Sequence, residues 1–146
     1  MISIRHTGMV TLNLKKSLFF WKKMIGFKIK NKNIEKGELL DKIFFSKKVK
    51  VKTIKMADTN NNLIELIYFY NFKKKQTKLT MPFTEGYTHL SITVSNIDKL
   101  YKKLKKNNIS FNSEPKVSED KKVKMTYCRT PENAYLELVE VLPNNI

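Results

Sequence analysis

Two histidines and two glutamates are the residues of this chain that could bind a metal ion, because they recur in the same order in its two halves. His6 begins the first set and Glu65 lies near the end of the first half, and His89 and Glu137 take the same places in the second half. The chain has no other histidine. Two neutral imidazoles and two carboxylates balance a divalent cation and leave positions for water or substrate. The pattern predicts one divalent metal site, for Zn, Ni, Co, Fe or Mn.

The glutamates carry the sharper argument because both lie in apolar runs. Glu65 is the one charged residue in 63–67, and Glu137 is the one charged residue in 135–139. An ionised carboxylate in such surroundings is unfavourable unless a cation or strong donors compensate it. No lysine or arginine in the strands stands where it would obviously pair with either carboxylate. A metal ion is therefore the expected partner of both.

Two other polar residues near these positions have simpler interpretations. Glu140 has a setting similar to that of Glu137, and we interpret it as an edge residue that faces water. Cys128 is the only cysteine, and as a strand residue it is expected to pack rather than to act as a fifth ligand. A lone cysteine excludes a disulfide framework, and the first residues do not resemble a signal peptide. Both features indicate a cytoplasmic protein.

The formal charge of +16 at pH 7 raises the question of a nucleic-acid partner. Lysines are spread along the whole chain, and the only arginines are Arg5 and Arg129, although arginine is the usual base-reading side chain. No nucleic-acid-binding motif is present. The longest apolar stretch, residues 63–70, is too short to cross a bilayer. We expect no nucleic-acid or membrane partner, and the positive field favours an anionic small-molecule substrate.

The elements that must position the four residues repeat as well. Each half opens with an alternating, strand-like segment, at 2–11 and 87–94, followed by a helix that Asn13 or Asn96 can cap. Three more strand-like segments follow in each half: 27–30, 42–57 with a break near 46–48, and 63–70 in the first, and 109–112, 123–129 and 135–142 in the second. Each half is therefore predicted to have the order βαβββ.

We predict one structural domain of the α+β class, built of two tandem βαβββ modules at 1–72 and 85–146 with a linker at 73–84. The two-residue period of a strand puts His89 on the face opposite the apolar residues of its strand, and His6 on the matching face of the first strand. Because the apolar face packs on the helix, the histidine face should look into a cavity.

The chain resembles the vicinal oxygen chelate superfamily over nearly its whole length. The segments that carry the resemblance are 6–10, 17–21 and 25–27 in the first half, and 86–92 and 130–138 in the second. The last of these is similar to the family's Asp-Pro-Asp-Gly-Asn-x-x-Glu-Leu turn and strand, and departs from it at Thr130, Asn133 and Ala134. The resemblance implies that the two modules form an open mixed-sheet barrel around the metal.

Within this superfamily, the full His-Glu-His-Glu set is most similar to lactoylglutathione lyase (glyoxalase I). The resemblance implies a metal-dependent lyase or isomerase, in which the metal binds two adjacent oxygens of a 2-oxo or thiol-adduct substrate and stabilises an enediolate. Glu137, or Glu65, would move the proton as general base and then as acid. Val10 and Phe69 stand where bacterial glyoxalases have an Arg and an Asn that hold glutathione, so the thiol is left open. A homodimer is also implied, with the site in one chain or across two.

Two alternative functions fit the same residues. The first is an epimerase similar to methylmalonyl-CoA epimerase, or another vicinal oxygen chelate enzyme, and the lysine excess agrees with a phosphorylated substrate. The second is a metal-independent resistance protein that sequesters a drug or metabolite. Both glutamates argue against the second, since a sequestering pocket has no need of them.

Overall fold

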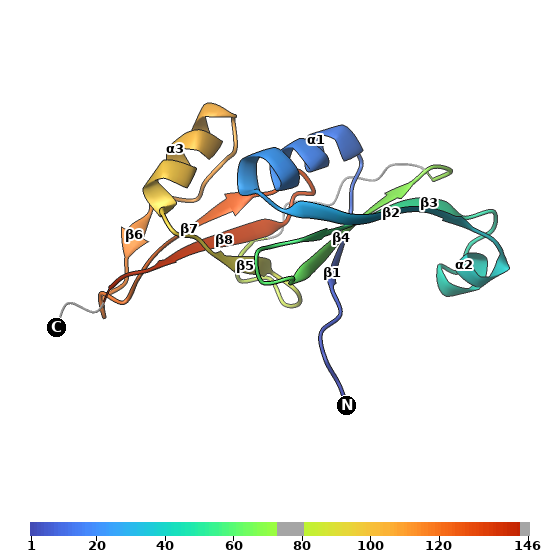
Figure 1. Ribbon diagram of the computed structural model, residues 1–146, viewed down its shortest axis with the longest axis horizontal. Helices are drawn as coiled ribbons and strands as arrows, with labels where there is room; N and C mark the ends of the chain where they lie inside the picture. The colour runs from blue at the N-terminus through green and yellow to red at the C-terminus, as the bar shows by residue number, and fades with distance from the viewer. Residues whose placement is uncertain (73–80, 144–146) are drawn as a thin grey trace. The chain divides into compact units, whose positions relative to one another are not determined.

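The computed structural model describes residues 1–72 and 81–143. The chain divides into two compact units, residues 1–76 and 77–146, and each contains one open four-stranded mixed sheet (Figure 1). The predicted α+β class is confirmed. Residues 73–80 of the predicted linker lie outside the described residues, and the predicted module bounds stay a prediction. In the described part of the chain, no helix combines the length and the apolar character that a membrane span needs.

The first unit has the predicted strand–helix–strand–strand–strand order, with one additional short helix. Its sheet has the order β1-β4-β3-β2, in which β1 and β4 are parallel and the other pairs are antiparallel. Its elements are β1 (Thr7–Val10), α1 (Leu14–Leu18), the π-helical η1 (Phe19–Ile25), β2 (Lys28–Lys36), α2 (Glu38–Ile43), β3 (Lys50–Ala57) and β4 (Leu63–Phe69).

The second unit repeats this topology without the additional helix. Its sheet has the order β5-β8-β7-β6, again with the first pair parallel and the other two pairs antiparallel. Its elements are β5 (His89–Thr93), α3 (Ile97–Lys106), β6 (Lys116–Val117), β7 (Val123–Arg129) and β8 (Tyr135–Val141). The internal repeat predicted from the sequence is therefore present in the strand order of both units.

Local signals in the sequence explain where the main helices begin and end. The backbone N–H of Lys16 donates to Asn13 Oδ1 at 3.0 Å, and that of Lys99 donates to Asn96 Oδ1 at 2.8 Å. Both predicted asparagine caps are thus confirmed. Gly26 ends η1 with φ of 104°, a left-handed conformation that glycine adopts without strain from a Cβ.

One face of each sheet forms the core of its unit. In the first unit, Trp21 of η1 is fully buried, as is Leu66 of β4; in the second, Leu104 of α3 and Leu136 of β8 are fully buried. Helices α1 and α3 each lie over the sheet of their own unit, while α2 lies at the end of the β2–β3 hairpin (Figure 1). Side chains alternate along a strand, so Glu65, next to Leu66, belongs to the face of its sheet that does not pack on the helix. By the same alternation, Glu137 of β8, next to Leu136, belongs to the face of its sheet that does not pack on the helix.

The predicted strand at 2–11 is shorter in the structure. It begins only at Thr7, which pairs with Ile64 near the start of β4. The segment before β4 is a tight turn, so it offers no extended backbone for residues 2–6 to pair with. His6 therefore lies just before the strand rather than within it.

Two other predicted strands are also wrong in part. Within the predicted strand 42–57, the first residues belong to helix α2 and the strand starts at Lys50. The carboxylate of Asp41 accepts the backbone N–H groups of Lys48 and Val49 at 3.0 and 2.7 Å, which ties the end of α2 to the start of β3. The predicted strand 109–112 forms only a single bridge, from Phe111 to Cys128.

Candidate metal centre

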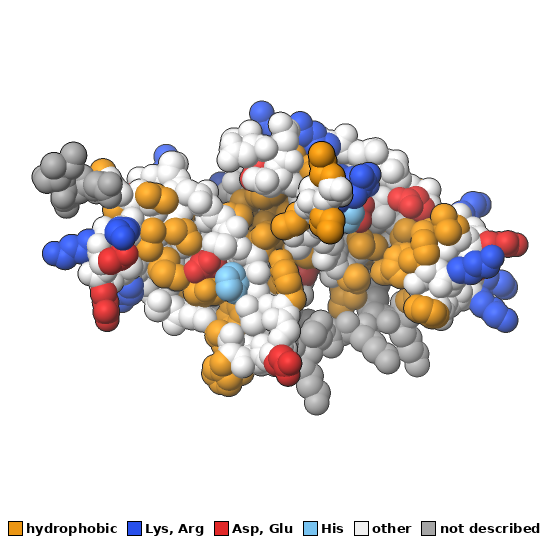
Figure 2. All heavy atoms as spheres, turned by 90° about the horizontal axis from the view of Figure 1, so that it is seen from below, with side chains coloured by type: hydrophobic (Ala, Val, Ile, Leu, Met, Phe, Trp, Pro, Cys, Tyr) orange, Lys and Arg blue, Asp and Glu red, His pale blue; other side chains and the backbone are white. Residues whose placement is uncertain are grey.

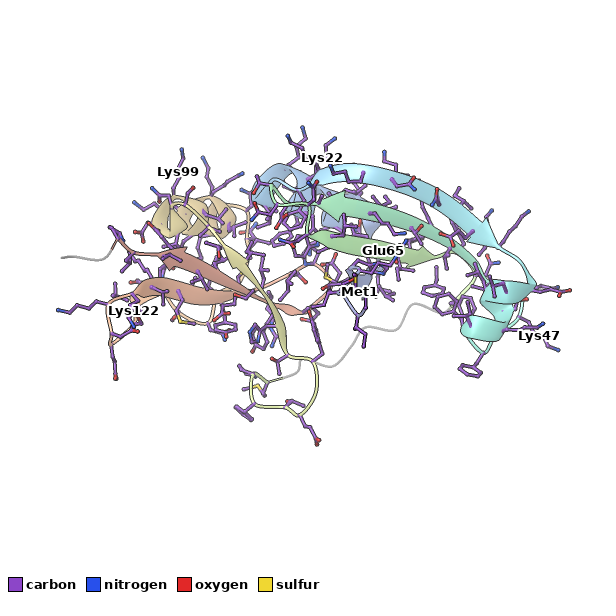
Figure 3. The ribbon with its side chains drawn as sticks, turned by 60° about the horizontal axis from the view of Figure 1, so that its bottom comes forward. Met1, Lys22, Lys47, Glu65, Lys99 and Lys122 are labelled. Carbon is purple, nitrogen blue, oxygen red and sulfur yellow. The ribbon has the colours of Figure 1, made fainter. Side chains whose placement is uncertain are left out.

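In the first unit, the parallel pairing of β1 and β4 brings His6 to Glu65. Gly8 is the register partner of Glu65, and His6 lies two residues earlier in the chain. The imidazole Nε2 of His6 is 3.2 Å from Glu65 Oε2. The Glu65 side chain, labelled on β4 in Figure 3, is 11% exposed and that of His6 is 26% exposed. The first predicted histidine–glutamate pair is therefore a direct contact.

The second unit builds the same pair with the same register. Ser91 is the register partner of Glu137, and His89 lies two residues before Ser91. His89 Nε2 is 3.5 Å from Glu137 Oε2. Histidine atoms are visible at the surface beside acidic side chains in Figure 2, in agreement with the partial exposure of both imidazoles. In each unit, therefore, one imidazole nitrogen faces one carboxylate oxygen of the same unit.

Glu65 has a cationic partner that the sequence prediction missed. Lys55 of β3 is directly opposite Glu65 in the antiparallel ladder. Its Nζ is 3.5 Å from Glu65 Oε1. The expectation that no lysine in the strands pairs with this carboxylate is wrong, because the partner lies on the neighbouring strand. The burial of Glu65 therefore does not by itself require a metal ion.

Tyr127 occupies the equivalent position in the second unit, directly opposite Glu137. Its hydroxyl donates to Glu137 Oε1 at 3.0 Å, and its ring meets the His89 ring edge-on at a centroid distance of 5.3 Å. Burial, followed by the hydrogen bond to Glu137, raises the pKa of Tyr127 above its ordinary value. The phenol therefore stays protonated and remains a donor at neutral pH.

The second ring nitrogens of the two histidines have different surroundings. His89 Nδ1 lies 2.8 Å from the Thr88 hydroxyl oxygen. His6 Nδ1 is buried and has no hydrogen-bond partner among the described residues. The imidazole of the second unit is therefore held at both nitrogens, and that of the first unit only at Nε2.

The other two polar residues considered from the sequence lie away from these pairs. Cys128 is fully buried, and burial raises the pKa of its thiol to about 12, so the predicted packing role is confirmed. Glu140 does not simply face water. One of its carboxylate oxygens accepts the backbone N–H of Ile97 at 2.7 Å and so caps the start of α3. The prediction that Glu140 faces water is wrong, because the residue that it caps, Ile97, is far away in sequence and becomes its neighbour only in the fold.

The distances within each pair fit two ligands of one ion. Zinc-type ions bind nitrogen and carboxylate oxygen at about 2.0–2.2 Å, which places two such donor atoms about 3.0–3.5 Å apart. The observed 3.2 and 3.5 Å lie in this range. Within the residues that the structure describes, no three His, Cys, Asp or Glu side chains come together. Each unit by itself thus supplies two donors, which is half of a typical first coordination sphere.

The model of the Glyoxalase/Bleomycin resistance protein/Dioxygenase superfamily matches residues 3–138. The chain belongs to this superfamily. The resemblance inferred from the sequence is thereby confirmed. No curated protein sequence matches the chain.

Solved structures of the glyoxalase superfamily share the fold of this chain. A glyoxalase family protein from Bacillus cereus has a TM-score of 0.88 at 20% identity, covering 98% of this chain and 96% of that one. The trypanothione-dependent glyoxalase I of Leishmania major has a TM-score of 0.66 at 20% identity, covering 96% and 87%. A glyoxalase I mutant from Zea mays has a TM-score of 0.65 at 16% identity, covering 94% of this chain and 47% of that one. At these identities, the likeness establishes the fold.

Proposed function

We propose that this glyoxalase-superfamily protein is a metal-dependent lyase or isomerase of the glyoxalase I type. His6, Glu65, His89 and Glu137 would bind one divalent ion together. The observation that supports this most is the equal construction of the two histidine–glutamate pairs, with the same register and with Nε2 facing Oε2 in both. The repeated fold accounts for the shared register, and the presence of a histidine and a glutamate at these positions in both repeats is what a shared metal site requires.

The two glutamates are suited to different tasks. A metal ion bound here would polarise adjacent oxygens of a 2-oxo or thiol-adduct substrate and stabilise an enediolate. The ammonium nitrogen of Lys55 lies 3.5 Å from Glu65 Oε1 and holds that carboxylate in place. Among the described residues, Glu137 has the neutral donor Tyr127 at its other oxygen. We therefore assign proton transfer to Glu137, and the role of a permanent ligand to Glu65.

The thiol part of the substrate is proposed to differ from glutathione. Val10 and Phe69 occupy the positions where bacterial glyoxalases have polar glutathione-binding residues. Val10 is 53% exposed, and the Phe69 ring packs edge-on against Phe44 and Phe72 at 5.1 and 5.4 Å. These positions offer apolar contact instead of charge. One solved glyoxalase I of this fold is described as trypanothione-dependent, and the charge of +16 favours an anionic adduct here.

Isomerisation of methylglyoxal adducts with several thiols tests this function. With added Ni, Co, Zn, Fe or Mn, the wild-type protein should convert at least one adduct, and Glu137→Gln should lower kcat by about 10²–10⁴-fold while the fold is retained. Glu140→Gln is the matched control, because it removes a charge three residues away on the same strand and keeps an oxygen for the Ile97 N–H. Equal rates for both variants would contradict the proposed role of Glu137.

A metal-independent binding protein is the second candidate, and one observation favours it. Glu65 already has Lys55 and His6 as partners without a metal. This candidate predicts that a chelator leaves ligand binding unchanged and that no adduct is isomerised. An epimerase would instead exchange the proton at the substrate carbon without net conversion of a hemithioacetal.

We further propose a homodimer, and mixing two inactive variants reveals where the site is built. Glu65→Gln disables the first unit and Glu137→Gln disables the second. If each site uses units of two chains, the mixed dimer contains one intact site and regains metal binding. If each site uses one chain, the mixture does not regain metal binding. Light scattering of the wild-type protein gives the oligomeric state independently.

A further inference from the structure

We propose that Tyr127 and Thr88 are positioning residues that hold Glu137 and His89 in the orientation required for metal binding. This proposal rests on the proposed metal site. Neither side chain is itself a candidate ligand. Tyr127 contacts Oε1 of Glu137 and Thr88 contacts Nδ1 of His89. These are the atoms of the pair that do not face each other, so the two residues surround the second pair from outside.

Tyr127 determines which carboxylate oxygen of Glu137 is presented. Its hydroxyl donates to Oε1 at 3.0 Å, while Oε2 is the oxygen that lies 3.5 Å from His89 Nε2. Tyr127 comes from β7 and Glu137 from β8, and their opposite positions in the ladder fix the direction of this bond. Rotation of the carboxylate would break the hydrogen bond. The phenol therefore keeps Oε2 directed toward the histidine.

Thr88 contacts the ring nitrogen of His89 that faces away from Glu137. A metal bound at Nε2 requires its lone pair, so the ring proton must reside on Nδ1. The Thr88 hydroxyl oxygen lies 2.8 Å from Nδ1 and can accept that proton's hydrogen bond. The edge-on contact with the Tyr127 ring, at 5.3 Å, restrains the same imidazole. Outer partners of this kind orient metal-binding histidines in many proteins.

The first unit lacks this arrangement, which makes the proposal specific to the second. Glu65 has Lys55 in the place of Tyr127, and an ammonium brings a positive charge that repels a metal cation. His6 Nδ1 has no partner among the described residues. The second pair is therefore the half of the proposed site in which both side chains have an uncharged hydrogen-bonding partner.

Metal affinity of single variants tests the proposal without reference to activity. Competition with a coloured chelator gives the Kd for Zn and Co, and the visible spectrum of bound Co reports its ligand geometry. Tyr127→Phe and Thr88→Val should each weaken binding about 10-fold or more and alter the Co spectrum. Thr88→Ser keeps the hydroxyl and should bind as the wild-type protein does. Tyr101→Phe is the matched control, since Tyr101 lies on α3 with its ring against Phe111.

The outcomes separate this proposal from the proposed function. If the wild-type protein binds metal and both variants bind it equally well with the same Co spectrum, the outer-shell proposal is overturned while the metal site stands. If the wild-type protein binds no divalent metal, both are overturned. If Tyr127→Phe does not fold, the Thr88→Val and Thr88→Ser pair decides, because loss in the first and recovery in the second support the proposal and equal binding overturns it.

Discussion

Lys55 lies directly across the β3–β4 ladder from Glu65, with its ammonium nitrogen 3.5 Å from Glu65 Oε1. This relationship gives the carboxylate a cation in the absence of metal. It also means that Glu65 can be held in its ligand position before any ion binds. The stability of the first unit and its affinity for metal are therefore coupled through one side chain.

Lys55→Met should lower the stability of the metal-free protein by about 1–2 kcal/mol. The expected loss is smaller than the 3–5 kcal/mol typical of a broken buried pair, because Lys55 is partly exposed. A saturating divalent ion should restore most of the loss, because it replaces the missing cation and binds only the folded protein. Thermal unfolding with and without metal measures both effects, and Lys52→Met on the same strand is the control. A loss in Lys55→Met that metal leaves unchanged would separate Glu65 from the metal site.

Asp58 should make stability depend on acid pH through the turn that joins β3 to β4. Burial alone would raise its pKa, but the side chain of Asn62 and the backbone N–H groups of Asn62 and Asn60 donate to its carboxylate and lower the pKa below 3.8. A lowered folded-state pKa contributes stability above the unfolded value, which is lost as the pH falls through the folded value. Asp58→Asn should therefore destabilise the protein at pH 7.

The difference in Tm between Asp58→Asn and the wild-type protein should shrink as the pH falls below 3.8. Circular dichroism melts between pH 7 and pH 3 measure it. A constant difference at every pH would show that the carboxylate charge does not stabilise this turn.

Cys128 should report unfolding and take no part in metal binding. Its side chain is fully buried, and burial raises the pKa of the thiol to about 12, so at pH 8 the thiolate is scarce and inaccessible. Labelling with a thiol reagent should be slow in the folded protein and fast in denaturant. Metal should slow it only as far as metal slows unfolding. Rapid labelling of the folded protein would contradict the buried position.

The cross-strand partners of both glutamates can be derived from the sequence by counting from the turns. In each unit a tight turn joins two strands, closed by Asp58 and Asn62 in the first and by Thr130 and Ala134 in the second. Counting three residues outward from each closing pair gives the pairs Lys55–Glu65 and Tyr127–Glu137. Turn-forming residues occupy 58–62 and 130–133, so this register follows from the sequence by counting outward from each turn.

Other features depend on contacts that no local pattern indicates. Glu140 caps α3 at Ile97, which is distant in sequence and adjacent only once the sheet and helix have packed. Helix α2 is fixed by Asp41, whose carboxylate binds backbone groups beyond the end of the helix. The repeat of histidine and glutamate can be recognised in the sequence, because the alternation of a strand and the apolar neighbours of each glutamate are properties of short segments.

Metal stoichiometry on untagged protein tests the shared site most directly. A shared site should bind one divalent ion per chain, measured by elemental analysis and by calorimetry. His6→Ala and His89→Ala, which lie in different units, should each weaken the binding of this ion by about 100-fold or more, because each removes one ligand of the same site. Two ions per chain, each lost with only one of the histidines, would contradict it, and so would no bound metal at all.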